Sequence, residues 1–125
     1  MRPLILIAAA FAVSSCTRPV QPPRVDLAQL LAGHVAGPPQ ACVTTFSNQN
    51  LRVIDSSTIT YGTGRTIYVN HLPGECPSIG SYNTIIADLH GNQYCHGDRV
   101  RGLEPDAIIP GPWCILGDWV PYRKP

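Results

Sequence analysis

Four cysteines constrain the fold more than any other feature of this 125-residue chain. They follow a long cysteine-poor start and stand at Cys42, Cys76, Cys95 and Cys114. A body of about 80 residues is near the lower limit for a self-sufficient core, so covalent cross-links are expected. Four cysteines pair in three ways. We favour Cys42–Cys114 with Cys76–Cys95, because the first bridge would join the opening and closing strands, and the other two pairings stay open.

The first 16 residues are typical of an exported protein. A positive start at Arg2 precedes an unbroken apolar run over residues 4–13. That length fits a secretory signal and is too short for a bilayer core, which needs roughly 20 residues. Residues 13–16 read Val-Ser-Ser-Cys and resemble the lipobox of bacterial lipoproteins. The resemblance implies a signal peptide over residues 1–15 and a lipid on Cys16.

The cysteine count supports disulfides over a metal site. Five cysteines are an odd number for an exported chain, and assigning Cys16 to lipid leaves an even four. Thiols oxidise outside the cytoplasm, so we interpret these four as two bridges. The competing interpretation, a zinc site, would use His71 with Cys76 and His90 with Cys95. We expect no metal and no cofactor.

A proline-rich segment follows Cys16 and is expected to act as a tether that spaces the body from the membrane. Within it, Asp26 is a good N-cap and Gly33 a plausible stop for one short helix. We therefore assign the tether to residues 16–41 and a small β domain to residues 42–125. Thr17 stands where enterobacterial sorting rules place aspartate for inner-membrane retention. By that resemblance, the periplasmic face of the outer membrane is favoured.

Short β-like runs separated by turn residues fill the chain from Cys42 onward. Their spacing of about 8–15 residues predicts an all-β fold, a small antiparallel barrel or sandwich, after one short helix. Glycines in the Tyr61–Arg65 segment predict a tight hairpin, and a strand apolar on both faces over residues 65–72 is expected to be central. The expected strands are residues 42–46, 52–54, 57–61, 65–71, 83–89, 94–101 and 114–120.

The order of several motifs resembles a family of small exported proteobacterial proteins of unknown function. The segment from Tyr68 to Cys76 matches its Y-x-N-x-L-x-x-x-C pattern, and Cys95-His96-Gly97-Asp98 matches its C-x-G-D pattern. The likeness covers about residues 42–122, including the four cysteines. The family has no established activity, so the resemblance implies no catalytic residue.

Charge and missing motifs narrow the functional classes. The formal net charge is +1 and only 14% of residues are charged, which excludes the broad basic surface that nucleic-acid binding needs. It excludes a polybasic membrane patch as well. The chain has no C-x-x-C and no G-x-S-x-G, so we do not expect a redox protein or an enzyme.

The most distinctive segment, Cys95-His96-Gly97-Asp98, and the C-terminal aromatic residues offer further candidate binding groups. Asp98 could bind a ligand, but we favour a structural role in which it caps backbone amides beside a bulge at Gly97. Trp113 could contribute to a binding face, although packing in the core is commoner for such residues.

Residues 102–113 carry Pro105, Pro110 and Pro112 and are expected to form a long rigid loop. Its Ile108 and Ile109 must either fold back on the domain or meet a partner, and we expect them to fold back.

The sequence thus predicts a lipid-anchored envelope protein that acts as a non-catalytic binding or structural module. Its lipid on Cys16 would attach it to the membrane, and its partner would be another envelope protein. We expect the protein itself to be a monomer. An alternative is an inhibitor of an envelope-directed hydrolase, since lysozyme inhibitors include small disulfide-braced lipoproteins of this size. Such an inhibitor should present a protruding rigid loop. A third alternative, a small periplasmic enzyme, should show a cleft that gathers Asp98 with a histidine.

Overall fold

The computed structural model describes residues 12, 14–18, 25–47 and 49–125. Most of the predicted signal peptide, and the prolines at 19, 22 and 23, lie outside these residues. Cys16 is exposed and makes no disulfide. No helix in the described ranges is long and apolar enough to cross a membrane.

The predicted helix is present but short. Helix α1 covers Leu27–Leu30, and the Asp26 carboxylate accepts a hydrogen bond from the Ala28 amide at 3.0 Å. Gly33, with a φ of 75°, lies in the turn that follows. The imidazole Nε2 of His34 lies 2.7 Å from the carbonyl oxygen of Gly64, which fixes this segment against the domain.

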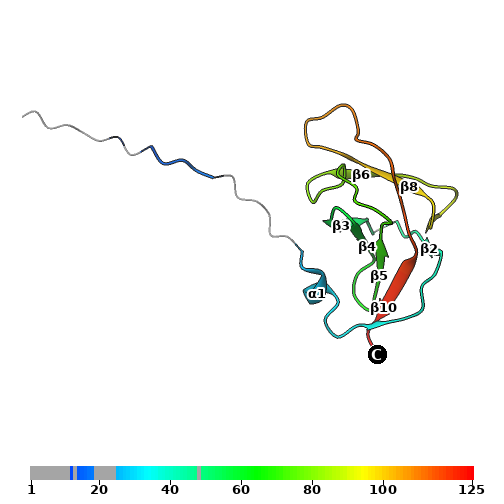
Figure 1. Ribbon diagram of the computed structural model, residues 1–125. Coiled ribbons are helices and arrows are strands. Elements are labelled where there is room, and N and C mark those ends of the chain that lie inside the picture. The colour runs from blue at the N-terminus through cyan, green and yellow to red at the C-terminus, as the bar shows by residue number, and fades with distance from the viewer. Residues whose placement is uncertain (1–11, 13, 19–24, 48) are drawn as a thin grey trace, which may run out of the picture.

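Antiparallel pairing builds the domain from three small sheets, which confirms the all-β class (Figure 1). The arrangement is sandwich-like and does not close into a barrel. The largest sheet has the order β1-β10-β5-β4-β3. Its strands are β1 (Val35–Ala36), β10 (Trp119–Arg123), β5 (Thr66–His71), β4 (Thr58–Tyr61) and β3 (Arg52–Asp55).

Two smaller sheets complete the domain. Strand β2 (Cys42–Thr44) pairs with β7 (Gln93–Cys95). Strands β6 (Thr84–Asp88), β8 (Arg99–Leu103) and β9 (Cys114–Ile115) form the third sheet, with β8 in the middle.

The hairpin and the central strand are confirmed. Strands β4 and β5 pair through a turn in which Gly62 and Gly64 have φ values of 92° and 77°. A Cβ on Gly62 would lie 2.8 Å from the carbonyl oxygen of Thr66, so this tight turn requires glycine. Strand β5 lies between β4 and β10, and both Ile67 and Val69 are buried.

The core lies between the sheets, and a buried amide stabilises its centre. Asn70 donates to the Gly117 carbonyl at 2.7 Å and accepts from the Gly117 amide at 2.9 Å. The side chain therefore pairs with backbone as a neighbouring strand would, which satisfies four buried polar groups. The largest fully buried side chains of the domain include Trp119, Tyr61, Ile59, Leu116, Val69 and Val100.

The favoured disulfide pairing is wrong. The bridges are Cys42–Cys95 and Cys76–Cys114. The opening strand β2 does not lie beside the closing strand, because it pairs with β7, where Cys42 and Cys95 are directly opposite with a Cα–Cα distance of 4.0 Å. Cys114 is then free to join the turn that contains Cys76.

Two predicted strands are each divided in two. The run at 94–101 reverses at Gly97, whose φ is 88°, so that β7 and β8 enter different sheets. The run at 114–120 separates into β9 and β10 in the same way.

The domain also begins earlier than the predicted boundary at residue 42. Strand β1 pairs with β10, and Gln40 exchanges two backbone hydrogen bonds with Trp119, at 2.8 and 2.9 Å. The later part of the expected tether is therefore attached to the sheet, because it covers an edge of β10 that would otherwise be open.

Candidate binding surface

The segment between β8 and β9, residues 104–113, forms the most prominent loop of the domain. In Figure 1 it is the orange loop that rises at the end opposite to α1 and the C-terminus. The sequence predicts this loop over residues 102–113, and the structure places residues 102 and 103 in β8 instead.

Hydrogen bonds close the base of the loop. The Gly111 amide donates to the Gly102 carbonyl at 2.9 Å. The hydroxyl of Ser78 donates to the Pro112 carbonyl at 3.0 Å and lies 3.4 Å from the Gly102 amide. The Cys76–Cys114 disulfide links the end of the loop to the same turn. Both ends of the loop are thus held against one buried serine.

Close backbone packing makes the two glycines at this base obligatory. A Cβ at Gly102 would lie 1.7 Å from the Ser78 carbonyl oxygen, and one at Gly111 would lie 2.3 Å from the Ser78 Cβ. Sequence reasoning missed this base, although paired glycines flanking a proline-rich segment were a usable signal.

The tip of the loop begins with a tight turn. The Ala107 amide donates to the Glu104 carbonyl at 3.1 Å. Pro105 and Asp106 occupy the two central positions, and Asp106 has a φ of 64°. A proline at the first central position and a left-handed residue at the second fit a type II turn. The second position of such a turn is usually glycine or asparagine.

Ile108 and Ile109 do not fold back on the domain, so that prediction is wrong. Their exposed fractions are 94% and 84%. The closed base directs the loop away from the body, and the prolines on either side restrict the backbone that would have to bend. Two adjacent apolar side chains are therefore left exposed at the tip of the loop.

Below the tip, Trp113 lies on the surface with two arginines. The guanidinium carbon of Arg101 is 4.1 Å from its ring centroid, and that of Arg99 is 5.0 Å away. Arg99 also pairs with Asp88 on the neighbouring strand, and the guanidinium bond holds the pKa of the Asp88 carboxyl below its ordinary value. Sequence reasoning identified Trp113 but missed both arginines, because their meeting with it depends on the β8–β9 pairing.

A groove of about 300 Å³ runs beside Trp113. It separates the turn at Leu72–Glu75 from the segment at Trp113–Ile115, and Ile115 is exposed. The tip, the arginines and this groove together form the candidate binding surface.

Asp98 belongs to a different and structural arrangement. It is buried, and its carboxylate accepts a hydrogen bond from the Cys95 amide at 2.7 Å. Its other oxygen lies 3.3 Å from Nδ1 of His90, whose side chain is exposed. Together with the left-handed Gly97, this confirms the predicted capping role. Asp98 and His90 line neither the groove beside Trp113 nor the cleft between β6 and the residues before β3.

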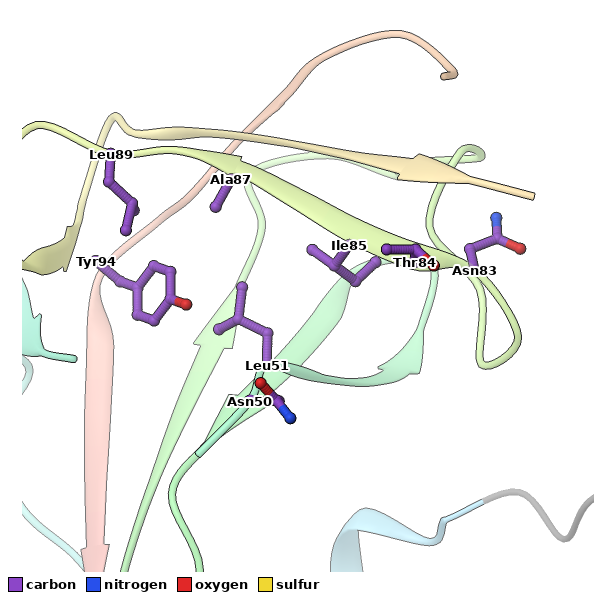
Figure 2. A pocket seen from close by; sticks show the side chains of 8 residues that line it. All are labelled: Asn50, Leu51, Asn83, Thr84, Ile85, Ala87, Leu89 and Tyr94. Atoms are coloured by element: carbon purple, nitrogen blue, oxygen red, sulfur yellow. The ribbon is translucent and has the colours of Figure 1, made fainter. Parts of the chain in front are cut away.

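A half-open cleft of about 370 Å³ lies between β6 and the residues that lead into β3 (Figure 2). Figure 2 shows Leu51, Ile85 and Tyr94 extending into it from different elements. Burial raises the pKa of Tyr94, so its hydroxyl stays protonated near neutral pH. The remaining lining residues, Asn50, Asn83, Thr84, Ala87 and Leu89, carry no charge. We interpret the cleft as a gap where two sheets of unequal length meet.

The cysteines that a zinc site would need are in disulfides, so they offer no free thiol to a metal. Cys76 and Cys95 are both in disulfides, and the described residues contain no group of three or more metal-ligating side chains.

The comparisons with known proteins add no relative: no family model, no curated protein and no solved structure matches the chain. The resemblance to the exported proteobacterial family therefore stays a prediction.

Proposed function

We propose that the protein is a lipid-anchored envelope protein that binds a protein partner through the 104–113 loop and catalyses no reaction. The observation that carries this proposal is the exposure of Ile108 and Ile109 on a loop whose base is closed. The anchor would be Cys16, on the periplasmic face of the outer membrane.

Rigidity makes this loop suited to binding. Association costs free energy whenever flexible groups must be ordered, and a loop fixed beforehand avoids much of that cost. Here the prolines, the serine-centred base and the Cys76–Cys114 bridge fix the loop before a partner arrives. Two adjacent isoleucines then supply apolar area that a partner can bury, which is the main favourable term in association.

The position of the loop fits attachment at the N-terminus. Helix α1 lies at one end of the domain, and the loop rises at the other (Figure 1). A tether that enters the domain at α1 would therefore attach at the end of the domain opposite to the loop.

The inhibitor alternative gains support from the same geometry. An inhibitor of a hydrolase must insert a narrow, stiff element into a cleft, and a protruding loop with a closed base meets this requirement. The partner would then be an envelope-directed hydrolase, and binding would lower its activity.

Site-specific photo-crosslinking of the full chain in the envelope tests the proposed function. A photoreactive residue at Ile109 should give a defined crosslinked product, and Ile108→Asp in the same chain should remove it. The matched control places the photoreactive residue at Thr63, in the exposed hairpin near α1, where no product is expected. Equal products from both positions, or none from Ile109, would contradict the proposal. Loss of a hydrolase activity on binding would identify the inhibitor alternative.

A further inference from the structure

The outward face beside the loop is both apolar and basic. Arg99 and Ile115 are directly paired across β8 and β9, so their side chains share one face of the sheet. Trp113 precedes β9 and lies against the guanidinium groups of Arg99 and Arg101. Its exposed fraction is 36%, and that of Ile115 is 53%. We name these four residues the basic face.

Arg101 on this face has unused capacity for an acidic partner. Among the described residues it takes part in none of the ion pairs, whereas Arg99 pairs with Asp88. A carboxylate delivered from outside would therefore meet an arginine that is already held in place by Trp113.

The loop tip has the opposite character. The charged residues in the 104–113 loop are Glu104 and Asp106, both acidic and exposed, and Ile108 and Ile109 follow them. The tip thus carries acidic and apolar side chains, whereas the basic face carries basic and apolar ones.

The groove provides room for the isoleucines. It adjoins the basic face through Trp113 and Ile115, and its volume is about 300 Å³. An apolar cavity of about 150 Å³ is enough to hold benzene. The exposure of Ile108 shows that the tip does not reach this groove within one copy.

From this complementarity we infer that the loop's partner is a second copy of this chain. The acidic, isoleucine-bearing tip of each copy docks on the basic face and groove of the other. The inference rests on the proposed function, because it names the partner of the same loop. A reciprocal exchange forms each contact twice around a two-fold axis, the commonest symmetry of soluble oligomers. It replaces the monomer expected from the sequence.

One acidic residue of the groove would repel the acidic tip of the other copy, so removing its charge tests the proposed contact. Glu75 is the charged residue that lines the groove, and it would face the acidic tip of the other copy. Glu75→Gln should therefore increase the association of the two copies.

The experiment uses two full-length copies with different epitope tags, expressed together in the envelope. A photoreactive residue at Ile108 should give a product that carries both tags, with the crosslink mapping to residues 72–75 or 113–115. Arg101→Glu in both copies should reduce the two-tag product at least tenfold. Restoring opposite charge by combining Arg101→Glu with Glu104→Arg should recover most of it. Arg65→Glu, an exposed arginine at the distant hairpin, is the control and should change nothing.

The outcomes separate this inference from the proposed function. A product that contains a different protein and never both tags would overturn the inference and leave the proposed function standing. No product from Ile108 or Ile109 would overturn both. A two-tag product that is unaffected by Arg101→Glu, in variants whose melting temperature is unchanged, would show that the basic face is not the docking surface and would also overturn the inference.

Discussion

Single residues at the base of the loop show how poorly this small domain would tolerate larger side chains there. Gly102 is the extreme case, because its Cα faces the backbone of Ser78 with no room for a methyl group. Backbone atoms cannot rotate away as a flexible side chain would, so any substitution must separate β8 from the Ser78 turn.

We therefore expect Gly102→Ala to destabilise the protein by about 2–4 kcal/mol, in the range of severe overpacking. Gly74→Ala is the matched control, because a Cβ there would meet nothing within 4 Å. Urea unfolding of the two variants measures the difference. Equal stability would show that the loop base is looser than this geometry requires.

The ion pair between Asp88 and Arg99 makes a second residue-scale prediction, about acid. The bond to the Arg99 guanidinium lowers the pKa of Asp88 from its ordinary value of 3.8. A carboxyl with a lowered folded-state pKa contributes stability above its unfolded pKa, and this contribution is lost as the pH falls through the folded value. Asp88→Asn should therefore lose less stability than the unchanged protein between about pH 4 and pH 2.

Thermal melts at pH 5 and pH 2.5 provide the measurement. Because both side chains are partly exposed to solvent, the effect should be small and should weaken further in high salt. Arg99→Gln should flatten the acid response in the same way, and the double variant should add nothing more. Additive effects of the two substitutions would show that the pair is not coupled.

At the scale of elements, the loop is the part that contributes least to folding. Ile108 and Ile109 bury almost nothing, while Ile67, from the central strand β5, has an exposed fraction of only 3%. The same residue type thus has opposite roles in the two elements.

Ile108→Asp should accordingly leave the free energy of unfolding unchanged to within about 0.5 kcal/mol, as is usual for exposed positions. Ile67→Ala should cost about 2–4 kcal/mol, because it removes buried methyl groups and leaves a cavity. Chemical denaturation of both variants tests this. A loss of several degrees in the melting temperature of Ile108→Asp would return the loop to the folded-back arrangement expected from the sequence.

At the scale of the whole molecule, local signals in the sequence predicted local structure well. Asp26 and Gly33 delimit the helix, and the glycines after Tyr61 form the hairpin. Asp98 caps the Cys95 amide as expected. Each of these features depends on residues only a few positions apart, so propensity and turn chemistry were sufficient.

Features that depend on which strands become neighbours were not predicted. The pairing of β2 with β7 decides the disulfides, and the pairing of β8 with β9 brings Arg99 and Arg101 to Trp113. Neither register leaves a local trace, because the alternation of a strand shows which side is buried and not which strand lies beside it. The direction of Ile108 was missed for a related reason, since it depends on how Ser78 closes a loop far away in the sequence.

The two disulfides should differ in what they stabilise. They close loops of similar size, with sequence separations of 53 and 38 residues, so chain entropy alone assigns each about 4 kcal/mol. Yet Cys42–Cys95 joins two strands that already pair, whereas Cys76–Cys114 joins the Ser78 turn to the end of the binding loop.

Replacing Cys76 and Cys114 by alanine should therefore lower stability and also increase hydrogen exchange at the loop base, at the amides of Gly102 and Gly111. Replacing Cys42 and Cys95 should lower stability by a similar amount and leave exchange at those two amides unchanged under native conditions. Exchange measured by mass spectrometry on both double variants decides the matter, after non-reducing peptide mapping has confirmed the bridges. If both variants loosened the loop base equally, the second bridge would be a general brace, and the rigidity of the loop would have to come from its prolines and Ser78 alone.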